Sequence, residues 1–239
     1  MTRPALRHVP LEERPPTAEF EFAGAEMACD FAGCLFWPRE SLLVVSDLHL
    51  EKGATFAARG QLIPPYDTSA TLRQLQRQIA VWRPARVVSL GDSFHDGDAS
   101  ARMPQPYRDL LTEMMTGREW IWIAGNHDPA PPVGVGGMTC EELVIGPVTF
   151  RHEPRAGWEA AEISGHLHPV ARIARRGKTV RRRCFATDGT RMVMPAFGAY
   201  TGGLNIREPA FDDLFDETRL HAHLLGRGRV FTIAGSQLV

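Results

Sequence analysis

The stretch LLVVSDLHLEKG, residues 42–53, joins a short apolar run directly to an acidic residue and a histidine. Its first four residues are leucine and valine, the composition of a central β-strand that is covered on both faces. Asp47 and His49 follow at a spacing of two residues, so both side chains can reach one point where the strand becomes a loop. The stretch therefore predicts a buried strand followed by two side chains that are able to bind one metal ion.

Two further segments of the chain have the same organisation. The apolar runs 86–90 and 120–124 each lead into a glycine and a polar residue, Asp92 after the first run and Asn126 after the second. The order of elements, β-β-α-β-α-β, predicts parallel strands joined by right-handed crossovers. The two helices are predicted from apolar residues at helical spacing, namely Leu72, Leu75, Ile79 and Trp82, and then Tyr107, Leu110, Leu111, Met114 and Met115.

The sequence before and after the predicted parallel strands and their two helices has a different pattern. Residues 1–18 are rich in proline, glutamate and arginine and predict a flexible arm, and residues 20–36 predict a two-stranded hairpin that turns at Gly24. We therefore expect an α/β fold of two packed, mixed β-sheets flanked by helices, with residues 19–239 forming a single domain without a cap. The second, mostly antiparallel sheet is predicted from short strands at 141–145, 147–151, 161–165, 170–174, 178–185 and 191–195.

The composition excludes several classes of protein. The 239 residues are 44% hydrophobic and 23% charged, as in ordinary globular proteins, and a net charge of −1 leaves only local attraction to nucleic acid. No apolar run has the length of a membrane span, and the N-terminus lacks the apolar segment of a secretory signal, so we expect a cytoplasmic protein without a membrane partner. The four cysteines form no CxxC pair and are expected to be reduced thiols, with a structural zinc site as the alternative.

Three more histidines stand at the ends of predicted strands. His152 follows the strand at 147–151, and the motif Gly165-His166-Leu167-His168 follows the strand at 161–165. Ligands bind beyond the carboxyl ends of strands in open α/β sheets, so these distant motifs can converge. Carboxylate, imidazole and carboxamide groups suit Mn, Fe, Zn or Ni. Each motif alone is weak, because a single histidine at a strand end is usually structural, but the ordered set indicates a metal site.

The ordered set DxH, GD, GNHD, H and GHxH resembles the calcineurin-like metallophosphoesterase superfamily, from about Leu42 to the C-terminal strand. The resemblance implies a four-layer sandwich fold and two divalent metal ions, with Mn²⁺ favoured and Fe, Zn or Ni as alternatives. It implies that one ion is bound by Asp47, His49 and His168, that the other is bound by Asn126, His152 and His166, and that Asp92 bridges them. It also implies that His127 contacts the substrate phosphate and protonates the leaving group.

Three longer motifs narrow the resemblance. DLHLEKG at 47–53, GDSFHD at 91–96 and MPAFGAYTGGLN at 194–205 are similar to the PdeM-type ligase-associated DNA damage response endonucleases. That resemblance implies a DNA phosphodiester substrate and repair partners that include a DNA ligase, a helicase and a nuclease. The family's second motif is often GDxxD, whereas here the acid comes one place later. The roles of His95 and Asp96 therefore stay open, with His95 either contacting substrate or orienting a ligand.

The expected reaction is hydrolysis of a phosphodiester by a metal-bridging hydroxide, in a DNA endonuclease or phosphodiesterase of DNA repair. Asp92 and His127 are the candidate catalytic residues. The candidate substrate-binding residues are Asn126, His127, His95 and Arg59. The alternative is a phosphatase or phosphodiesterase for a small nucleotide metabolite. A site without a cap suits a polymeric substrate better than a small metabolite, so this alternative is less favoured. A non-enzymatic scaffold is the third interpretation, and the complete set of ligand positions argues against it.

Other features have two interpretations each. The arginine-rich segment 172–183 either binds DNA phosphates or forms a solvated hairpin that turns at Gly177. The glycine-rich loop around Tyr200 either lines the pocket, with the ring stacked on a base, or is a structural turn. We expect Trp120 and Trp122 in the core, and His221 and His223 on the surface. Whether the protein forms a homo-oligomer stays open.

Overall fold

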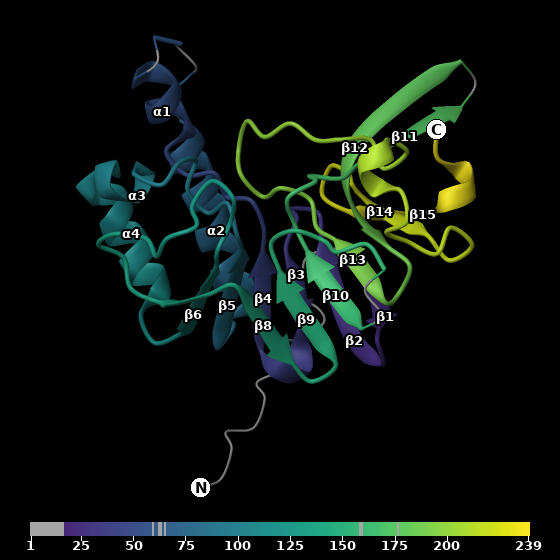
Figure 1. Ribbon diagram of the computed structural model, residues 1–239, viewed down its shortest axis with the longest axis horizontal. Helices are drawn as coiled ribbons and strands as arrows, with labels where there is room; N and C mark the ends of the chain where they lie inside the picture. Colours follow the sequence, from purple (N-terminus) through teal and green to yellow (C-terminus); the bar gives the residue numbers. More distant parts are fainter. Residues whose placement is uncertain (1–16, 59, 62–63, 65, 158–159, 176) are drawn as a thin grey trace, which may run out of the picture.

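The computed structural model describes residues 17–58, 60–61, 64, 66–157, 160–175 and 177–239 (Figure 1). Most of the predicted arm, residues 1–16, lies outside the described residues, as does Arg59. The arm was predicted to extend to residue 18, but Thr17 and Ala18 belong to the first strand and pair with Asp30 and Cys29.

The first sheet has seven strands in the order β1-β2-β3-β4-β5-β6-β7. Strands β4 to β7 are parallel, as predicted for the first three of them, and β1 to β4 are antiparallel. The predicted hairpin is extended by a third strand, because the Asp30 carboxylate accepts three backbone N–H bonds in a turn over residues 32–34. The strands are β1 (Thr17–Phe22), β2 (Ala25–Asp30), β3 (Leu35–Trp37), β4 (Leu42–Val45), β5 (Arg86–Leu90), β6 (Glu119–Ile123) and β7 (Met138–Cys140).

The second sheet runs β15-β14-β12-β13-β10-β9-β8, and β11 pairs with β12 as a long hairpin. It is mostly antiparallel, as predicted, but β10 is parallel to both β9 and β13. The residues that follow β9 and β10 therefore emerge at the same edge. The strands are β8 (Glu142–Ile145), β9 (Val148–Arg151), β10 (Ala161–Ser164), β11 (Val170–Arg175), β12 (Lys178–Thr187), β13 (Arg191–Val193), β14 (His221–Leu225) and β15 (Val230–Ala234).

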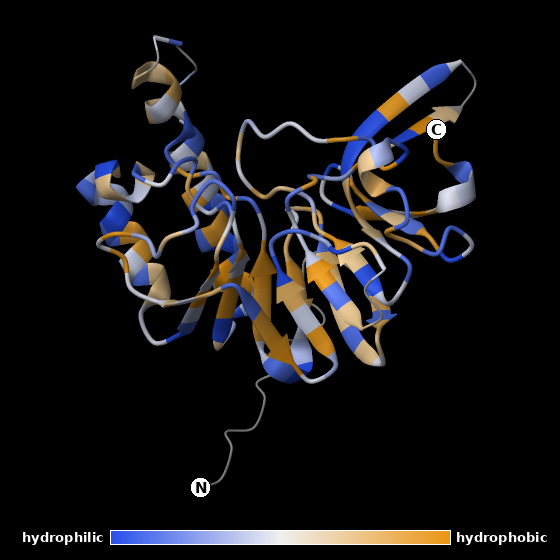
Figure 2. Ribbon diagram, in the orientation of Figure 1, coloured by the Kyte–Doolittle hydropathy of each residue, from blue (hydrophilic) through white to orange (hydrophobic). Residues whose placement is uncertain are grey.

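The two sheets pack face to face through one apolar core (Figure 2). Val44, Val88 and Ile121 of the first sheet share this core with Phe150 and Phe185 of the second, and all five are buried. Burial on both faces explains why the parallel strands read as continuous apolar runs rather than alternating ones. The prediction of two packed mixed sheets is confirmed.

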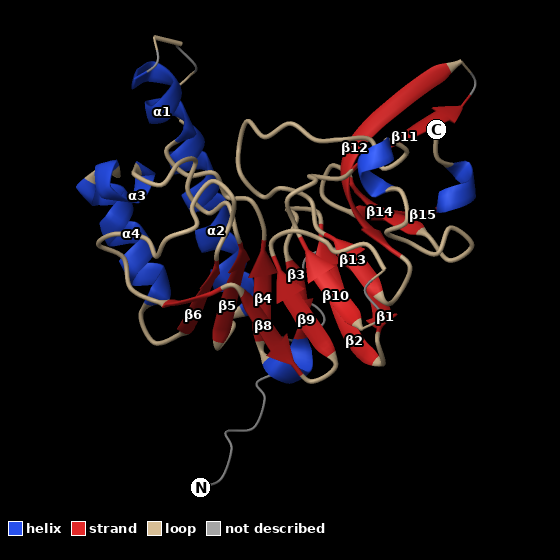
Figure 3. Ribbon diagram, in the orientation of Figure 1, coloured by secondary structure: helices blue, strands red, loops and turns tan. Residues whose placement is uncertain are grey.

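Helices cover the outer face of the first sheet (Figure 3). In α2, the predicted face is buried, and the helix ends where Arg83 adopts φ 47° just before Pro84. The outer face of the second sheet packs against the segment 206–220 and its short 3₁₀ turn at Pro209–Phe211, so the α-helices flank one side of the sandwich in the described part of the chain. The helices are α1 (Lys52–Ala58), α2 (Asp67–Trp82), α3 (Ala99–Arg102) and α4 (Gln105–Met115), with further 3₁₀ turns at Pro38–Glu40 and Gly235–Gln237. No described helix has the length and apolarity needed to cross a bilayer.

His223 corrects a prediction, because it is buried rather than on the surface, while His221 is exposed as expected. The His223 ring stacks on Phe20 of β1 at 4.9 Å between centroids, and its Nδ1 lies 2.8 Å from Thr232 Oγ1. The ring thus links β1, the edge strand of the first sheet, with β14 and β15 of the second sheet. Trp120 and Trp122 are buried, as predicted.

We expect His223 to make the protein sensitive to acid. Burial lowers the pKa of His223 to about 4, whereas the unfolded chain has a value of 6.5. Between these pH values the unfolded chain binds the proton and the folded protein does not, so the free energy of unfolding falls as the pH decreases. The whole difference corresponds to about 3 kcal/mol. In urea unfolding across this range, His223→Gln should flatten the pH dependence, whereas His221→Gln should retain it; equal curves would contradict the assignment.

Candidate metal centre

The predicted ligand motifs meet at one edge of the sandwich, where the parallel strands end (Figure 1). Asp47 and His49 follow β4, Asp92 follows β5, and Asn126 follows β6. His152, His166 and His168 follow β9 and β10 of the second sheet, which bring them to the same edge. All seven predicted ligand residues are therefore brought together.

The first cluster consists of Asp47, His49 and His168. His168 Nε2 lies 3.2 Å from Asp47 Oδ1 and 3.3 Å from His49 Nε2. Burial lowers the pKa of His49 to about 4, so its ring is neutral at pH 7 and offers a lone pair. Ser46 Oγ and the backbone N–H of His166 donate to the Asp47 carboxylate and hold it in place.

The second cluster consists of Asn126, His152 and His166. Asn126 Oδ1 lies 2.9 Å from His152 Nε2 and 3.1 Å from His166 Nδ1, and the two ring nitrogens are 3.2 Å apart. His152 Nδ1 donates to the Leu90 carbonyl at 2.8 Å, which leaves Nε2 facing the cluster. A hydrogen bond from the other ring nitrogen to a carbonyl is the usual way in which a metal-ligating histidine is oriented.

The Asp92 carboxylate faces both clusters. Its Oδ1 lies 3.3 Å from His152 Nε2, and its Oδ2 lies 4.0 Å from His49 Nε2. Burial opposes ionisation of Asp92, but the hydrogen bond with His152, the charges of His152 and His49 and the N–H of His127 together outweigh burial and hold the pKa of Asp92 below its usual range. Burial likewise lowers the pKa of His152, but the bond with Asp92, the charges of Asp47 and Asp92 and the bond to the Leu90 carbonyl together outweigh burial and raise that pKa to about 9. A divalent cation between these groups would replace the proton that they share.

The backbone around the ligands is strained. Five of the seven residues have positive φ values between 44° and 66°, a region that L-residues rarely occupy, although aspartate and histidine tolerate it better than most. Such outliers cluster at functional sites, where the surrounding structure imposes them. The five are Asp47, His49, Asp92, His166 and His168.

Glycines make room for these side chains. A Cβ atom on Gly165 would overlap Ser46 Oγ and Asp47 Oδ2, and one on Gly125 would overlap the backbone N and the Oδ1 of Asp92. Without a Cβ, the glycine backbone can lie directly against the ligand carboxylates. These close approaches explain why glycine stands beside so many of the ligands.

Gly165→Ala should therefore displace the Asp47 carboxylate while leaving the sheets folded. We expect the affinity for Mn²⁺ to fall about 10- to 100-fold, the range found when groups that position ligands are disturbed. The matched control is Gly97→Ala, because Gly97 has no atom within 4 Å of its Cβ position. Titration calorimetry compares the two variants, with circular dichroism to check folding, and equal affinities would contradict the steric argument.

His127 lies beside both clusters without belonging to either. Its Nδ1 donates to the His95 carbonyl at 2.9 Å, its Nε2 lies 3.9 Å from Asp92 Oδ2, and its side chain is 41% exposed. The exposed ring can therefore present Nε2 to a molecule bound at the clusters. The His95 ring stacks on His127 at 5.3 Å and meets the edge of His49 at 5.6 Å, so it packs between two site residues. Contact of His95 with a substrate stays a prediction.

Asp96, whose role the sequence left open, contacts two helices. Its Oδ2 accepts from Thr55 Oγ1 of α1 at 2.6 Å and from Arg102 Nη2 of α3 at 2.7 Å. Asp96 thus ties two short helices together beside the site. The sequence did not indicate this link, because neither helix was predicted.

The arginine-rich hairpin and the glycine-rich loop are joined. Arg181 Nη2 donates to the Gly203 carbonyl at 2.6 Å, and Lys52 Nζ of α1 donates to the Tyr200 carbonyl at 3.0 Å. The loop also packs on the first cluster, since the Gly198 N–H donates to the Asp47 carbonyl at 3.1 Å. These contacts hold the loop beside the first cluster, and stacking of Tyr200 on a base stays a prediction. The hairpin projects from the sandwich as a mostly exposed arm (Figure 1).

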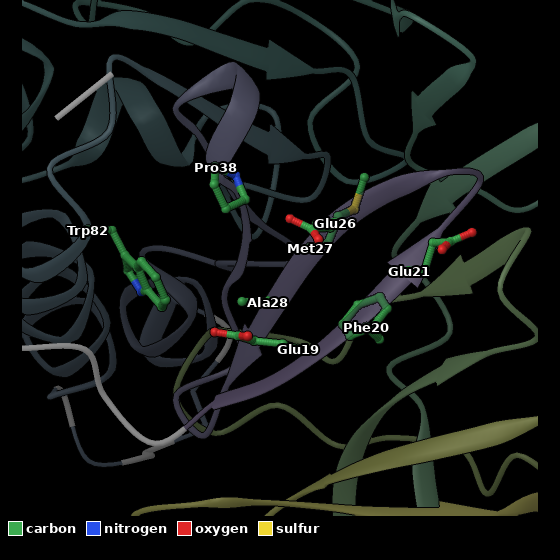
Figure 4. Close-up of a pocket in the computed structure, with 8 residues that line it drawn as sticks. All are labelled: Glu19, Phe20, Glu21, Glu26, Met27, Ala28, Pro38 and Trp82. Atoms are coloured by element: carbon green, nitrogen blue, oxygen red, sulfur yellow. The ribbon is translucent and has the colours of Figure 1, made fainter. Parts of the chain in front are cut away.

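A cavity of about 380 Å³ near Trp82 contains none of the candidate ligands (Figure 4). Glu19, Glu21 and Glu26 line it and give it an acidic character that repels phosphate groups. The edge that carries the two clusters, with its mixture of imidazoles and carboxylates, is the site whose donor atoms suit divalent cations.

Solved structures include proteins that are similar to this chain. The crystal structure of Pseudomonas putida nuclease MPE matches 91% of this chain and 100% of its own, with a TM-score of 0.71 and 28% sequence identity. The structure of Yfce, a phosphoesterase from E. coli, matches 81% of this chain and 98% of its own, with a TM-score of 0.39 and 16% identity. A search of curated protein sequences found no match.

A model of the calcineurin-like phosphoesterase family matches residues 41–222, which include every candidate ligand. This match covers most of the chain and agrees with the resemblance seen in its motifs. It also agrees with clusters of aspartate and histidine that suit divalent metals. The protein is a metal-dependent phosphoesterase, and the chain belongs to the calcineurin-like phosphoesterase family.

Proposed function

We propose that the protein is a dinuclear metal-dependent phosphodiesterase that cleaves DNA in DNA repair. The observation that carries the proposal is the position of Asp92, whose two carboxylate oxygens face different ligand clusters. In this proposal Asp47, His49 and His168 hold one ion, Asn126, His152 and His166 hold the other, and Asp92 contacts both. We propose Mn²⁺ as the native ion, with Fe, Zn and Ni as alternatives that the same donors would accept.

Two bound cations would act as Lewis acids for a phosphoryl group and would make a water molecule more acidic. The protein's own groups supply the rest of the reaction. Asn126 and His127 lie next to each other at the open side of the clusters, where they can hydrogen-bond to phosphoryl oxygens. His127 Nε2 can donate a proton to the leaving oxygen, and the bond from Nδ1 to the His95 carbonyl fixes the ring for that transfer.

Three observations favour a polymeric substrate. The His127 side chain is 41% exposed, so the site opens directly to solvent. Exposed arginines on the hairpin, such as Arg172 and Arg182, offer positive charge that phosphates along a strand could use. The similar structure from Pseudomonas putida is that of a nuclease. A DNA ligase, a helicase and another nuclease are the partners that we propose.

A substrate panel tests the proposal. Purified protein with Mn²⁺ should cleave single-stranded or duplex DNA and bis-p-nitrophenyl phosphate, and excess chelator should abolish both activities. Activity on p-nitrophenyl phosphate should be much lower than on the diester. Hydrolysis of monoesters alone, or of small cyclic nucleotides but not DNA, would contradict the nuclease assignment and leave the metal chemistry intact.

A further inference from the structure

A cavity of about 190 Å³, here called the loop cavity, lies between helix α2, residues 197–201 and the base of β12. Thr71 and Gln74 line it from α2, and Arg183 lines it from β12. None of its lining residues is a candidate metal ligand. It is therefore a hollow beside the metal centre rather than the metal centre itself.

Arg183 is the cation of the loop cavity. Its guanidinium group is half-buried and donates from Nη1 to the Ala196 carbonyl at 2.7 Å. Among the described residues, no carboxylate lies within ion-pair distance of Arg183. The buried Arg151 and Arg191 differ, since each lies within 3.5 Å of a Glu162 oxygen. A charge that is withdrawn from water without a counter-ion is costly, so an anion bound in the cavity would relieve that cost.

The loop cavity and the first metal cluster lie on either side of the backbone of residues 197–198. Phe197 and Gly198 line the cavity, and their N–H groups donate to the carbonyls of Ser46 and Asp47 at 2.8 and 3.1 Å. Lys52 and Arg181 hold the same loop from either side, through the Tyr200 and Gly203 carbonyls. The cavity is thus formed by a braced loop and needs no rearrangement before a ligand can bind.

We propose that the loop cavity is a phosphate subsite, in which Arg183 binds a non-scissile phosphate of the polynucleotide that is cleaved at the metal centre. This inference rests on the proposed function and adds a second contact with the substrate. A planar guanidinium with free N–H groups suits the oxygens of a phosphate, with which it can form two parallel hydrogen bonds. The ligand class is an oligonucleotide phosphate, either an internal diester or a terminal monoester.

Kinetics of the variants Arg183→Met and Arg183→Lys test the subsite. On a short oligonucleotide, Arg183→Met should raise KM about tenfold or more, the size expected when one charged phosphate contact is removed. The loss in kcat/KM should be at least about ten times greater on the oligonucleotide than on bis-p-nitrophenyl phosphate, which has a single phosphate. Arg183→Lys should recover part of the loss. The matched control is Arg73→Met, because Arg73 is an exposed cation of α2 outside the cavity lining.

A binding measurement gives a readout that does not depend on turnover. Fluorescence anisotropy with a labelled oligonucleotide, in chelator, should show weaker binding by Arg183→Met and a salt dependence of log affinity that is shallower by about one. Oligonucleotides with and without a terminal phosphate separate a monoester ligand from an internal diester.

Equal losses on the oligonucleotide and on bis-p-nitrophenyl phosphate would overturn the subsite, because they would show that Arg183 acts by holding the loop through Ala196. Unchanged oligonucleotide binding by Arg183→Met would also overturn it. A wild-type protein that cleaves no diester would instead refute the proposed function, and the binding measurement would still decide the subsite.

Discussion

Asp92→Asn should lower kcat on bis-p-nitrophenyl phosphate by about 1,000-fold or more. The substitution preserves the shape of the side chain but removes the negative charge that faces both clusters. Because Asp92 is proposed to bind both ions, its substitution should remove several kcal/mol of transition-state stabilisation. A loss of about 4 kcal/mol corresponds to 1,000-fold in rate. The metal content of the purified variant, measured by mass spectrometry, should fall below the two ions expected for the wild type.

The matched control for this variant is Asp98→Asn. Asp98 lies six residues later in the same loop region, and its side chain is 91% exposed. It should keep both its activity and its metal content. A variant Asp92→Asn that binds two ions and turns over at a near wild-type rate would rule out the bridging role.

His127→Ala should have the second-largest effect, and its size should depend on the leaving group. Proton donation by a positioned acid contributes about 10²- to 10⁴-fold, and it matters most when the leaving oxygen is a poor leaving group. DNA has an alkoxide leaving group, so its cleavage should lose most of this factor. Esters of p-nitrophenol should lose little, because that leaving group departs without a proton.

The metal content should separate this variant from a ligand variant, because His127 belongs to neither of the two clusters and His127→Ala should retain both ions. His221→Ala, which removes an exposed imidazole elsewhere, is the control and should match the wild type. The dependence of kcat on the pKa of the leaving group should be steeper for His127→Ala than for the wild type. Parallel dependences would remove His127 from the acid role.

The central strands and long helices could be predicted from the sequence because their signals are local. Strands β4 and β5 are continuous apolar runs, and α2 carries four apolar residues at helical spacing. The order of the ligand motifs after these strands then predicted that the side chains would converge. The structure brings them together, although binding of metal by each residue stays a prediction.

The elements that were missed depend on contacts between distant parts of the chain. Helices α1 and α3 are too short for a periodic pattern, and β7 has three residues. The burial of His223 comes from Phe20, which lies about two hundred residues earlier in the sequence. The position of Arg183 likewise requires the register of β12, in which Arg183 pairs with Val170 at the base of the hairpin.

The left-handed backbone at five candidate ligands implies a trade-off between activity and stability. Each such residue costs of order 1 kcal/mol relative to a relaxed conformation, and glycine would remove most of that cost. Selection for thermostability alone would therefore favour glycine at positions such as His49 and His168, and each gain would remove a candidate metal ligand. Thermostabilised versions of this protein should therefore be designed with these positions held fixed.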